Sequence, residues 1–312
     1  MSARMVLVTG ASGFIGKYLV ADLLRRGCRV RAAVRDPGKL KFSDDVEMVA
    51  IGDLLQPVDW RQAVAGADHV VHLAGLAHAG GAEQNDALYQ RVNTQATLDL
   101  ADAAASAGVR RFILMSSIRA QCGFSSNAPL TDDSIPAPTD AYGRSKLAAE
   151  RGLAERDIDW IALRPVLVYG RGVKANMAFL MRLARLPLPL PLGGLTARRS
   201  VLALDNLASA VAFAMEPNCP PRRAYIVADR EPVSVPEMIS DLRKGLGRRP
   251  GLVAVPERAL AALARASGQQ DRFARLASDL VAYPQALIAA GWKAEVETRS
   301  ALERLLADHD GA

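Results

Sequence analysis

The sequence has few of the residues that build cross-links and metal centres. It contains three cysteines and four histidines in 312 residues. Cys28, Cys122 and Cys219 are odd in number and far apart, so their spacing fits neither a disulfide framework nor a metal cluster. The histidines also lack the spacing of metal ligands. We therefore expect a protein without a bound metal that works in a reducing cytoplasm.

Long hydrophobic runs and long basic runs are scarce as well. No apolar stretch reaches the roughly 20 residues that a membrane-spanning helix needs. The first ten residues read as a strand and a turn, without the apolar core of a signal peptide. The net charge is +6, but the arginines are scattered or paired and are not interleaved with aromatic residues. These features argue against a membrane protein and a nucleic-acid-binding protein, and a mild positive excess suits an anionic substrate such as a diphosphate.

Apolar runs that alternate with helical patterns fill the first half of the chain. Strands are expected at 5–8, 29–34, 46–51, 69–74, 111–117 and 159–165, and helices at 14–26, 86–107 and 140–156. This alternation predicts an α/β fold, namely a Rossmann-type, doubly wound parallel sheet. Ligands bind at the carboxyl ends of the strands in such sheets.

The pattern changes after residue 165. A stretch rich in Pro and Gly at 185–200 precedes helices near 204–215, 236–246, 257–266 and 298–308, with a strand at 224–229. We expect a dinucleotide-binding domain over 1–170 and a smaller α+β lobe, mainly for substrate binding, over 171–312.

Three glycines follow the first strand at intervals of three residues. Gly10 permits a tight turn, Gly13 lets the backbone approach a pyrophosphate, and Gly16 lets helix and strand pack closely. Phe14 and Ile15 begin the helix, whose free N–H groups and dipole favour phosphate. Strand, turn and helix occur in the required order, so the segment predicts dinucleotide binding.

The end of the second strand is expected to select the cofactor. An acidic residue there binds the ribose 2′-hydroxyl of NAD, whereas an arginine favours the 2′-phosphate of NADP. The chain has Arg35 followed by Asp36. Arg35 favours NADP over NAD, although a surface arginine beside a turn at Pro37 is an alternative interpretation.

Tyr142 and Lys146 are four residues apart in a predicted helix, so their side chains share one face. A free phenol titrates near pH 10, and a nearby cation favours its anion. We expect Lys146 to lower the pKa of Tyr142, which would then exchange a proton with a substrate hydroxyl during hydride transfer. In the alternative interpretation, the pair is a half-buried tyrosine and a surface lysine.

These motifs, with GDL at 52–54, HLAG at 72–75, VNTQAT at 92–97 and SS at 116–117, resemble the extended short-chain dehydrogenase/reductase family. Within it, the chain is similar to nucleotide-sugar 4-epimerases and to UDP-4-keto-6-deoxy-N-acetylhexosamine reductases of the quinovosamine type. The resemblance implies a nucleotide-diphosphate sugar as substrate and a homodimer formed by the helices at 86–107 and 140–156. It also implies cofactor contacts, besides Tyr142 and Lys146, at Asp53, Leu54, Leu73, Ala74, Gly75, Asn93 and Pro165, and substrate diphosphate contacts at Asn176 and Arg199.

A hydroxyl should hold the reacting oxygen beside the tyrosine. Ser117 is the expected residue. Many sugar-modifying relatives carry the hydroxyl one place later, where this chain has Ile118. The register is therefore open, and Ser116 is the alternative. His72 lies in a strand and is expected in the core, whereas His78 in the next loop is a candidate substrate contact.

Several functions stay open at this point. The favoured one is an NAD(P)-dependent reductase of a 4-keto sugar, and the alternative is a 4-epimerase that oxidises and reduces the same carbon. The segment Gln121-Cys122-Gly123 replaces the Val-Tyr-Gly frequent in those relatives, and it also resembles hydroxysteroid dehydrogenases. A hydroxysteroid or flavonoid-type alcohol is therefore another possible substrate. A non-catalytic dinucleotide sensor is the last alternative, although such relatives commonly lose the tyrosine.

Overall fold

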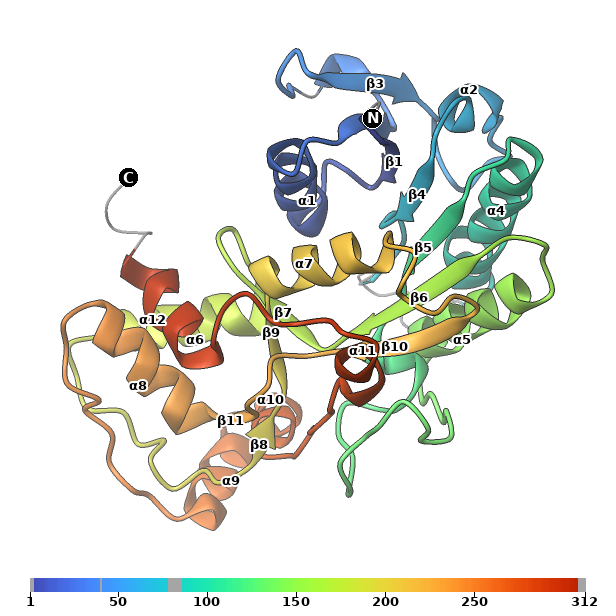
Figure 1. Cartoon of the computed structure of the whole chain (residues 1–312). Helices are drawn as coiled ribbons and strands as arrows, with labels where there is room; N and C mark the ends of the chain where they lie inside the picture. Colours follow the sequence, from blue (N-terminus) through green and yellow to red (C-terminus); the bar gives the residue numbers. More distant parts are fainter. Residues whose placement is uncertain (1–2, 40, 78–85, 308–312) are drawn as a thin grey trace.

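A parallel sheet organises the chain in the computed structural model, which describes residues 3–39, 41–77 and 86–307. The strand order is β3-β2-β1-β4-β5-β6-β10, and every pairing is parallel (Figure 1). The order reverses between β1 and β4, which opens a crevice at their carboxyl ends. The strands are β1 (Met5–Thr9), β2 (Arg29–Val34), β3 (Val46–Ala50), β4 (His69–His72), β5 (Arg111–Met115), β6 (Trp160–Pro165) and β10 (Arg223–Val227).

Helices cover both faces of this sheet, which confirms the predicted Rossmann-type architecture. Alternate residues of β1 point to opposite sides, so Val6 and Val8 enter one core while Met5 and Leu7 enter the other. The first core packs on α1 (Phe14–Arg25), α7 (Leu204–Ala214) and α11 (Gln285–Ala289). The second packs on α2 (Arg61–Val64), α4 (Ala96–Ser106) and α5 (Ala141–Ala154). Burial on both faces explains the continuous apolar runs of the strands.

The single helix expected at 86–107 consists of three successive segments. It begins as α3 (Asp86–Tyr89), continues as the π-helical turn η2 (Gln90–Gln95) and ends as α4. Wider turns of this kind change the direction of side chains and are frequent at functional sites.

The edge strand β10 comes from the part of the chain that we assigned to the small lobe. It pairs with β6 from Arg223 opposite Ile161 to Val227 opposite Pro165. Tyr225, Ile226 and Val227 are fully buried in this position. Residues 204–227 therefore return to the sheet after the chain has first entered the lobe. Sequence order alone hides this return, because the pairing is between distant segments.

A third core holds the small lobe together (Figure 1). It lies between α6 (Ala175–Arg185), α8 (Val235–Gly245) and α12 (Thr298–Ala307). The remaining elements are η1 (Pro37–Lys39), η3 (Ile118–Ala120), β7 (Leu167–Tyr169), β8 (Arg198–Arg199), β9 (Val201–Ala203), β11 (Val233–Ser234), α9 (Glu257–Ala266) and α10 (Gln270–Leu276). β7 pairs with β9 in parallel and β8 pairs with β11 in antiparallel orientation.

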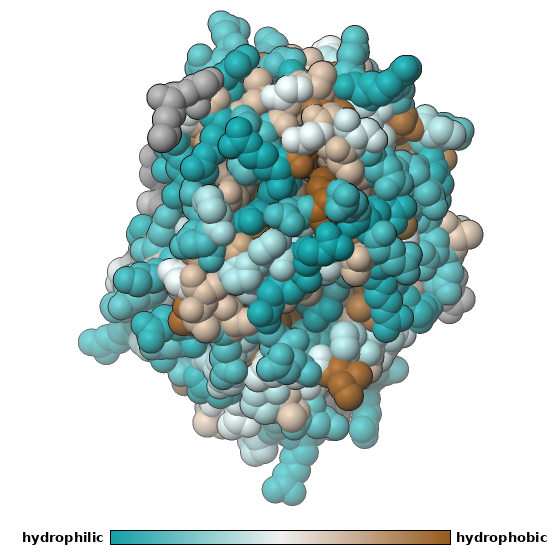
Figure 2. Space-filling model, turned by 45° about the vertical axis from the view of Figure 1, so that its right-hand side comes forward, coloured by the Kyte–Doolittle hydropathy of each residue, from teal (hydrophilic) through white to brown (hydrophobic). Residues whose placement is uncertain are grey.

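Hydrophilic residues predominate on the face seen in Figure 2, and hydrophobic ones are dispersed over it. Exposed large apolar side chains come from separate segments, for example Ile135, Leu188 and Leu263. None of the helices in the described part of the chain combines the length and hydrophobicity needed to cross a bilayer.

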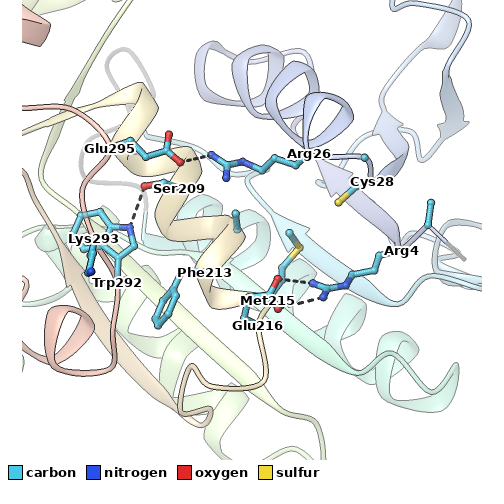
Figure 3. A pocket seen from close by; sticks show the side chains of 13 residues that line it. Arg4, Arg26, Cys28, Ser209, Phe213, Met215, Glu216, Trp292, Lys293 and Glu295 are labelled. Carbon is cyan, nitrogen blue, oxygen red and sulfur yellow. Dashed lines mark hydrogen bonds and ion pairs between the residues drawn. The ribbon is translucent and has the colours of Figure 1, made fainter. Parts of the chain in front are cut away.

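A cavity of about 550 Å³ lies at the amino-terminal edge of the sheet. Ion pairs join its walls: Arg4 binds Glu216 at 2.7 Å, and Arg26 binds Glu295 at 2.7 Å (Figure 3). Each pair connects the first 26 residues to a segment beyond residue 214. The cavity therefore lies where the two halves of the chain meet. It is at the opposite edge of the sheet from the loops that follow β1 and β4.

Candidate active site

The turn after β1 has room only for glycine at two of its three glycine positions. Gly10 has φ +66°, and a Cβ atom there would lie 2.7 Å from the amide nitrogen of Ala74. A Cβ atom on Gly16 would lie 2.2 Å from the carbonyl oxygen of Gly10. Gly13 is the N-cap residue of α1, and no side chain caps the helix there. The free N–H groups at this terminus, beside a turn without side chains, fit the pyrophosphate of a dinucleotide.

The loop after β4 is held against this turn by a buried pair. The hydroxyl of Thr9 accepts a hydrogen bond from the Ala74 amide at 3.1 Å and lies 2.7 Å from Nδ1 of His72. The tautomer of His72 decides which of these two atoms donates. Burial lowers the pKa of His72 to about 3, so the ring is neutral at neutral pH. His72 is the core residue that the sequence indicates, and the residues after it are partly exposed at Leu73 and Ala74 and exposed at Gly75.

Asn93 connects this loop to the helix α5. Its side chain accepts from the Leu76 amide at 2.7 Å and donates to the Leu76 carbonyl at 2.9 Å. It also donates to the hydroxyl of Ser145 at 3.0 Å, which in turn donates to the Tyr142 carbonyl at 2.7 Å. Asn93 lies in η2 and is fully buried. The π-helical turn thus directs the side-chain amide of Asn93, which joins the loop after β4 to helix α5.

Tyr142 lies in the first turn of α5, and Ser117 is near enough to its phenol to lower the pKa of that group. The hydroxyl of Ser117 accepts from the Arg119 amide at 3.1 Å. Burial raises the pKa of Tyr142 above its ordinary value, and Ser117 opposes that rise. The pair forms a donor and acceptor site for one oxygen atom of a substrate.

Lys146 is buried one turn further along α5, and its ammonium donates to the Met115 carbonyl at 2.9 Å. Burial lowers its pKa to about 8, and the negative charge of Glu150 opposes this. We expected Lys146 to lower the pKa of Tyr142. The pKa of Tyr142 is instead raised, chiefly by burial; Ser117 and the charge of Arg119 oppose this rise, and the charge of Asp140 adds to it.

Ser116 and Ser117 point in different directions. The hydroxyl of Ser116 donates to Glu150 inside the protein, so Ser117 alone lies beside the phenol. Glu150 also accepts from Arg164, at 3.0 Å to Nε and 2.5 Å to Nη2. Arg164 donates in addition to Gln121 at 3.2 Å. This buried network braces the ends of β5 and β6 behind the site.

Removing one charge of this network should cost more stability than removing both. Both side chains of the Arg164–Glu150 pair are almost fully buried. We expect Glu150→Leu to lower the free energy of unfolding by about 3 kcal/mol, because it leaves the arginine buried without its carboxylate. The double variant Glu150→Leu, Arg164→Met should recover part of this loss. Urea unfolding of both variants tests the prediction, and a double variant less stable than the single one contradicts it.

The other predicted cofactor residues lie at the carboxyl ends of the strands. Arg35 is exposed at the end of β2, while Asp36 accepts from the Gly38 amide at 3.0 Å and shapes the next turn. Asp53 is exposed after β3 and accepts from the Leu55 amide at 3.1 Å. Leu54 is partly buried in the sheet core, and Pro165 is buried at the end of β6.

The predicted substrate residues belong to the small lobe. Asn176 is exposed in the first turn of α6. Arg199 donates to the carbonyls of Arg275 and Ser278 at 2.8 Å and to that of Phe124 at 3.0 Å. Its guanidinium thus joins a carbonyl in the last turn of α10 to two loop carbonyls. His78 falls outside the described residues, and the described ones contain no group of three side chains able to hold a metal.

Sequence reasoning missed Arg119 beside the tyrosine. It follows Ser117 by two residues, and its side chain binds Asp140 at the start of α5. A lone arginine in a loop carries no local signal of such a contact, since its partner is 21 residues further along the chain.

Comparisons with known proteins agree with this geometry. Residues 6–228 match the NAD dependent epimerase/dehydratase family. The chain is 32% identical over 300 residues to UDP-glucose 4-epimerase of Vibrio cholerae, covering 93% of this chain and 90% of that enzyme. It is 31% identical over 260 residues to a 3 beta-hydroxysteroid dehydrogenase/Delta 5→4-isomerase of Mycobacterium tuberculosis, covering 78% and 70%. The solved structure of MoeE5 with UDP-glucose and NAD superposes with a TM-score of 0.72 at 27% identity, covering 96% and 97%.

Proposed function

Because the chain belongs to the NAD-dependent epimerase/dehydratase family of extended short-chain dehydrogenases/reductases, we propose that it oxidises or reduces C4 of a nucleotide-diphosphate sugar. The observation that carries the proposal is the proximity of Ser117 to the phenol of Tyr142, at the same edge of the sheet as the glycine turn. A proton donor and a dinucleotide cradle together support alcohol–ketone chemistry. MoeE5 is bound to a nucleotide sugar and NAD in its structure, which supports the substrate class.

The residues of the site take separate roles in this reaction. When bound, the nicotinamide supplies the hydride or accepts it. In the reducing direction, Tyr142 donates its proton to the carbonyl oxygen as C4 gains hydride, and Ser117 holds that oxygen. In the oxidising direction, Tyr142 accepts the hydroxyl proton. Lys146 would hold the nicotinamide ribose, and the turn at Gly10–Gly16 would hold the pyrophosphate.

The sugar proposal has two versions, a reductase and an epimerase, and a further candidate differs in substrate class. The 4-keto reductase is supported by the departure from the usual pattern at Gln121–Gly123 and by Arg35 after β2, because an arginine at the end of the second strand favours NADP. The 4-epimerase is supported by the similarity to the Vibrio cholerae enzyme along 93% of the chain. The likeness to the mycobacterial dehydrogenase supports a steroid-type alcohol as a second substrate class.

Nicotinamide absorbance separates these versions. We expect purified protein to consume NADPH, and NADH more slowly, when it is given a UDP-4-keto-6-deoxy-N-acetylhexosamine. An epimerase would instead interconvert UDP-glucose and UDP-galactose without net change in absorbance. The steroid version would oxidise a 3β-hydroxysteroid with NAD and ignore both sugars. Tyr142→Phe should strongly reduce whichever activity is found, and failure of both sugar assays would contradict the proposal.

A further inference from the structure

The ion pair of Arg119 and Asp140 lies at the start of α5, two residues before Tyr142. Nη2 of Arg119 donates to Oδ2 of Asp140. Oδ1 of Asp140 accepts from the Gly143 amide at 2.7 Å and caps the helix. One carboxylate therefore fixes both the first turn of α5 and the guanidinium beside it.

The backbone of Arg119 contacts Ser117, the serine near the phenol of Tyr142. Its amide donates to the hydroxyl of Ser117 at 3.1 Å. Its carbonyl lies directly under α5, where a Cβ atom on Gly143 would come within 2.2 Å of the oxygen. Arg119 thus touches the serine loop with its amide and the tyrosine helix with its carbonyl and side chain.

The guanidinium of Arg119 is buried but only partly satisfied. The residue is 9% exposed, and its Nε and Nη1 atoms have no hydrogen-bond partner within the described ranges. The ring of Phe124 covers it, with the centroid 3.4 Å from Cζ, and Arg275 stacks on this ring at 4.3 Å. Screening by water is weak for such a group. Its charge can therefore act on the groups that surround it.

We propose that Arg119 and Asp140 are a positioning pair for the acid–base tyrosine. The pair holds Ser117 against Tyr142 and sets the balance of charge around the phenol, with the arginine favouring phenolate and the aspartate opposing it. The inference rests on the proposed role of Tyr142.

The groups around the phenol have opposite effects on its pKa. Burial raises the pKa of Tyr142, Ser117 lowers it, Asp140 raises it, Arg119 lowers it, and Tyr89 raises it. Tyr89 packs edge-on against Tyr142 with ring centroids 6.2 Å apart. On the next turn of α5, Lys146 is engaged with the Met115 carbonyl. The two charges to change are therefore Arg119 and Asp140.

The experiment is a titration of Tyr142 in two variants that should shift its pKa in opposite directions. The chain has six tyrosines, so ¹³C labelling of the tyrosine ring, with Tyr142→Phe to identify the signal, gives the pKa of Tyr142 by NMR. Arg119→Met should raise it by about one pH unit, and Asp140→Asn should lower it by about the same amount. Asparagine still caps a helix, so this second variant should keep the fold. The titration is run on the full chain with and without NAD⁺.

Two controls separate charge from packing. Arg119→Lys keeps the cation and should shift the pKa of Tyr142 by less than half as much as Arg119→Met. Arg275→Met removes the outer arginine of the stack and should leave that pKa unchanged. Shifts of the same sign in Arg119→Met and Asp140→Asn, or no shift in either, would overturn the inference. Because the titration needs no substrate, its result stands apart from the sugar assays, whose failure would refute the proposed function alone.

Discussion

Tyr142→Phe is expected to lower kcat/KM for hydride transfer by about 10²- to 10⁴-fold, the range typical of losing a positioned proton donor. The substitution keeps the ring that packs on Tyr89 and removes only the hydroxyl that lies near Ser117. The fold and the cofactor cradle should therefore survive, and cofactor affinity should change little. Steady-state kinetics with the substrate found by the absorbance assay, together with cofactor titration by fluorescence, measure both quantities.

A matched hydroxyl deletion tests whether the loss is specific. Tyr18 lies in α1, and its hydroxyl donates to Asp205 at 2.9 Å, far along the chain from Tyr142. Tyr18→Phe should cost stability of roughly 1 kcal/mol, the usual net value of one hydrogen bond, and leave kcat/KM near wild type. Equal kcat/KM in Tyr142→Phe and wild type would remove the tyrosine from the mechanism.

The direction of the pH profile follows from the raised pKa of Tyr142. The reducing reaction needs the protonated phenol, so it should persist over the neutral range and fall only as pH rises through that pKa. The oxidising reaction needs phenolate and should increase over the same alkaline limb. A bound oxidised nicotinamide adds positive charge and shifts that limb to lower pH.

Local patterns were sufficient for the features that depend on neighbouring residues. The strands, the glycine turn and the i, i+4 spacing of Tyr142 and Lys146 are properties of short segments, so the sequence predicts them. The position of β10 is different, because an apolar strand at 223–227 could belong to either lobe until its pairing with β6 is known. The π-helical turn at Gln90–Gln95 likewise has no distinctive residue pattern.

The charge state of the site depends on contacts between residues that are far apart in the sequence, and residue spacing does not predict such contacts. The helix pattern correctly places Lys146 near Tyr142, but the Met115 carbonyl that holds its ammonium belongs to β5. Burial then shifts the pKa of both residues in the direction of their neutral forms. The choice between Ser116 and Ser117 also required the structure, since Glu150 takes one hydroxyl and the other lies near Tyr142.

Gly16→Ala should do the most damage of any substitution in the glycine turn. A methyl group at that position would lie 2.2 Å from the Gly10 carbonyl oxygen and 2.7 Å from Cα of Ala11. Both contacts are backbone atoms, so the turn itself must move away from α1. We expect a loss of about 3 kcal/mol in the free energy of unfolding without cofactor, and cofactor binding weaker by at least about 100-fold because the N–H groups of the turn are displaced.

Gly13→Ala provides the contrast that makes this prediction specific. Its methyl group would lie 3.2 Å from the Gly10 oxygen, which a shift of a few tenths of an ångström relieves, and the backbone of Gly13 is extended with φ −74°. The apo protein should thus stay within about 1 kcal/mol of wild type. Cofactor affinity should still fall, since the methyl group occupies the space that the pyrophosphate needs. Urea unfolding and cofactor titration of both variants separate the packing role of Gly16 from the binding role of Gly13. If both variants lost stability equally and bound cofactor equally, the two glycines would share one structural role and the cradle would lie elsewhere.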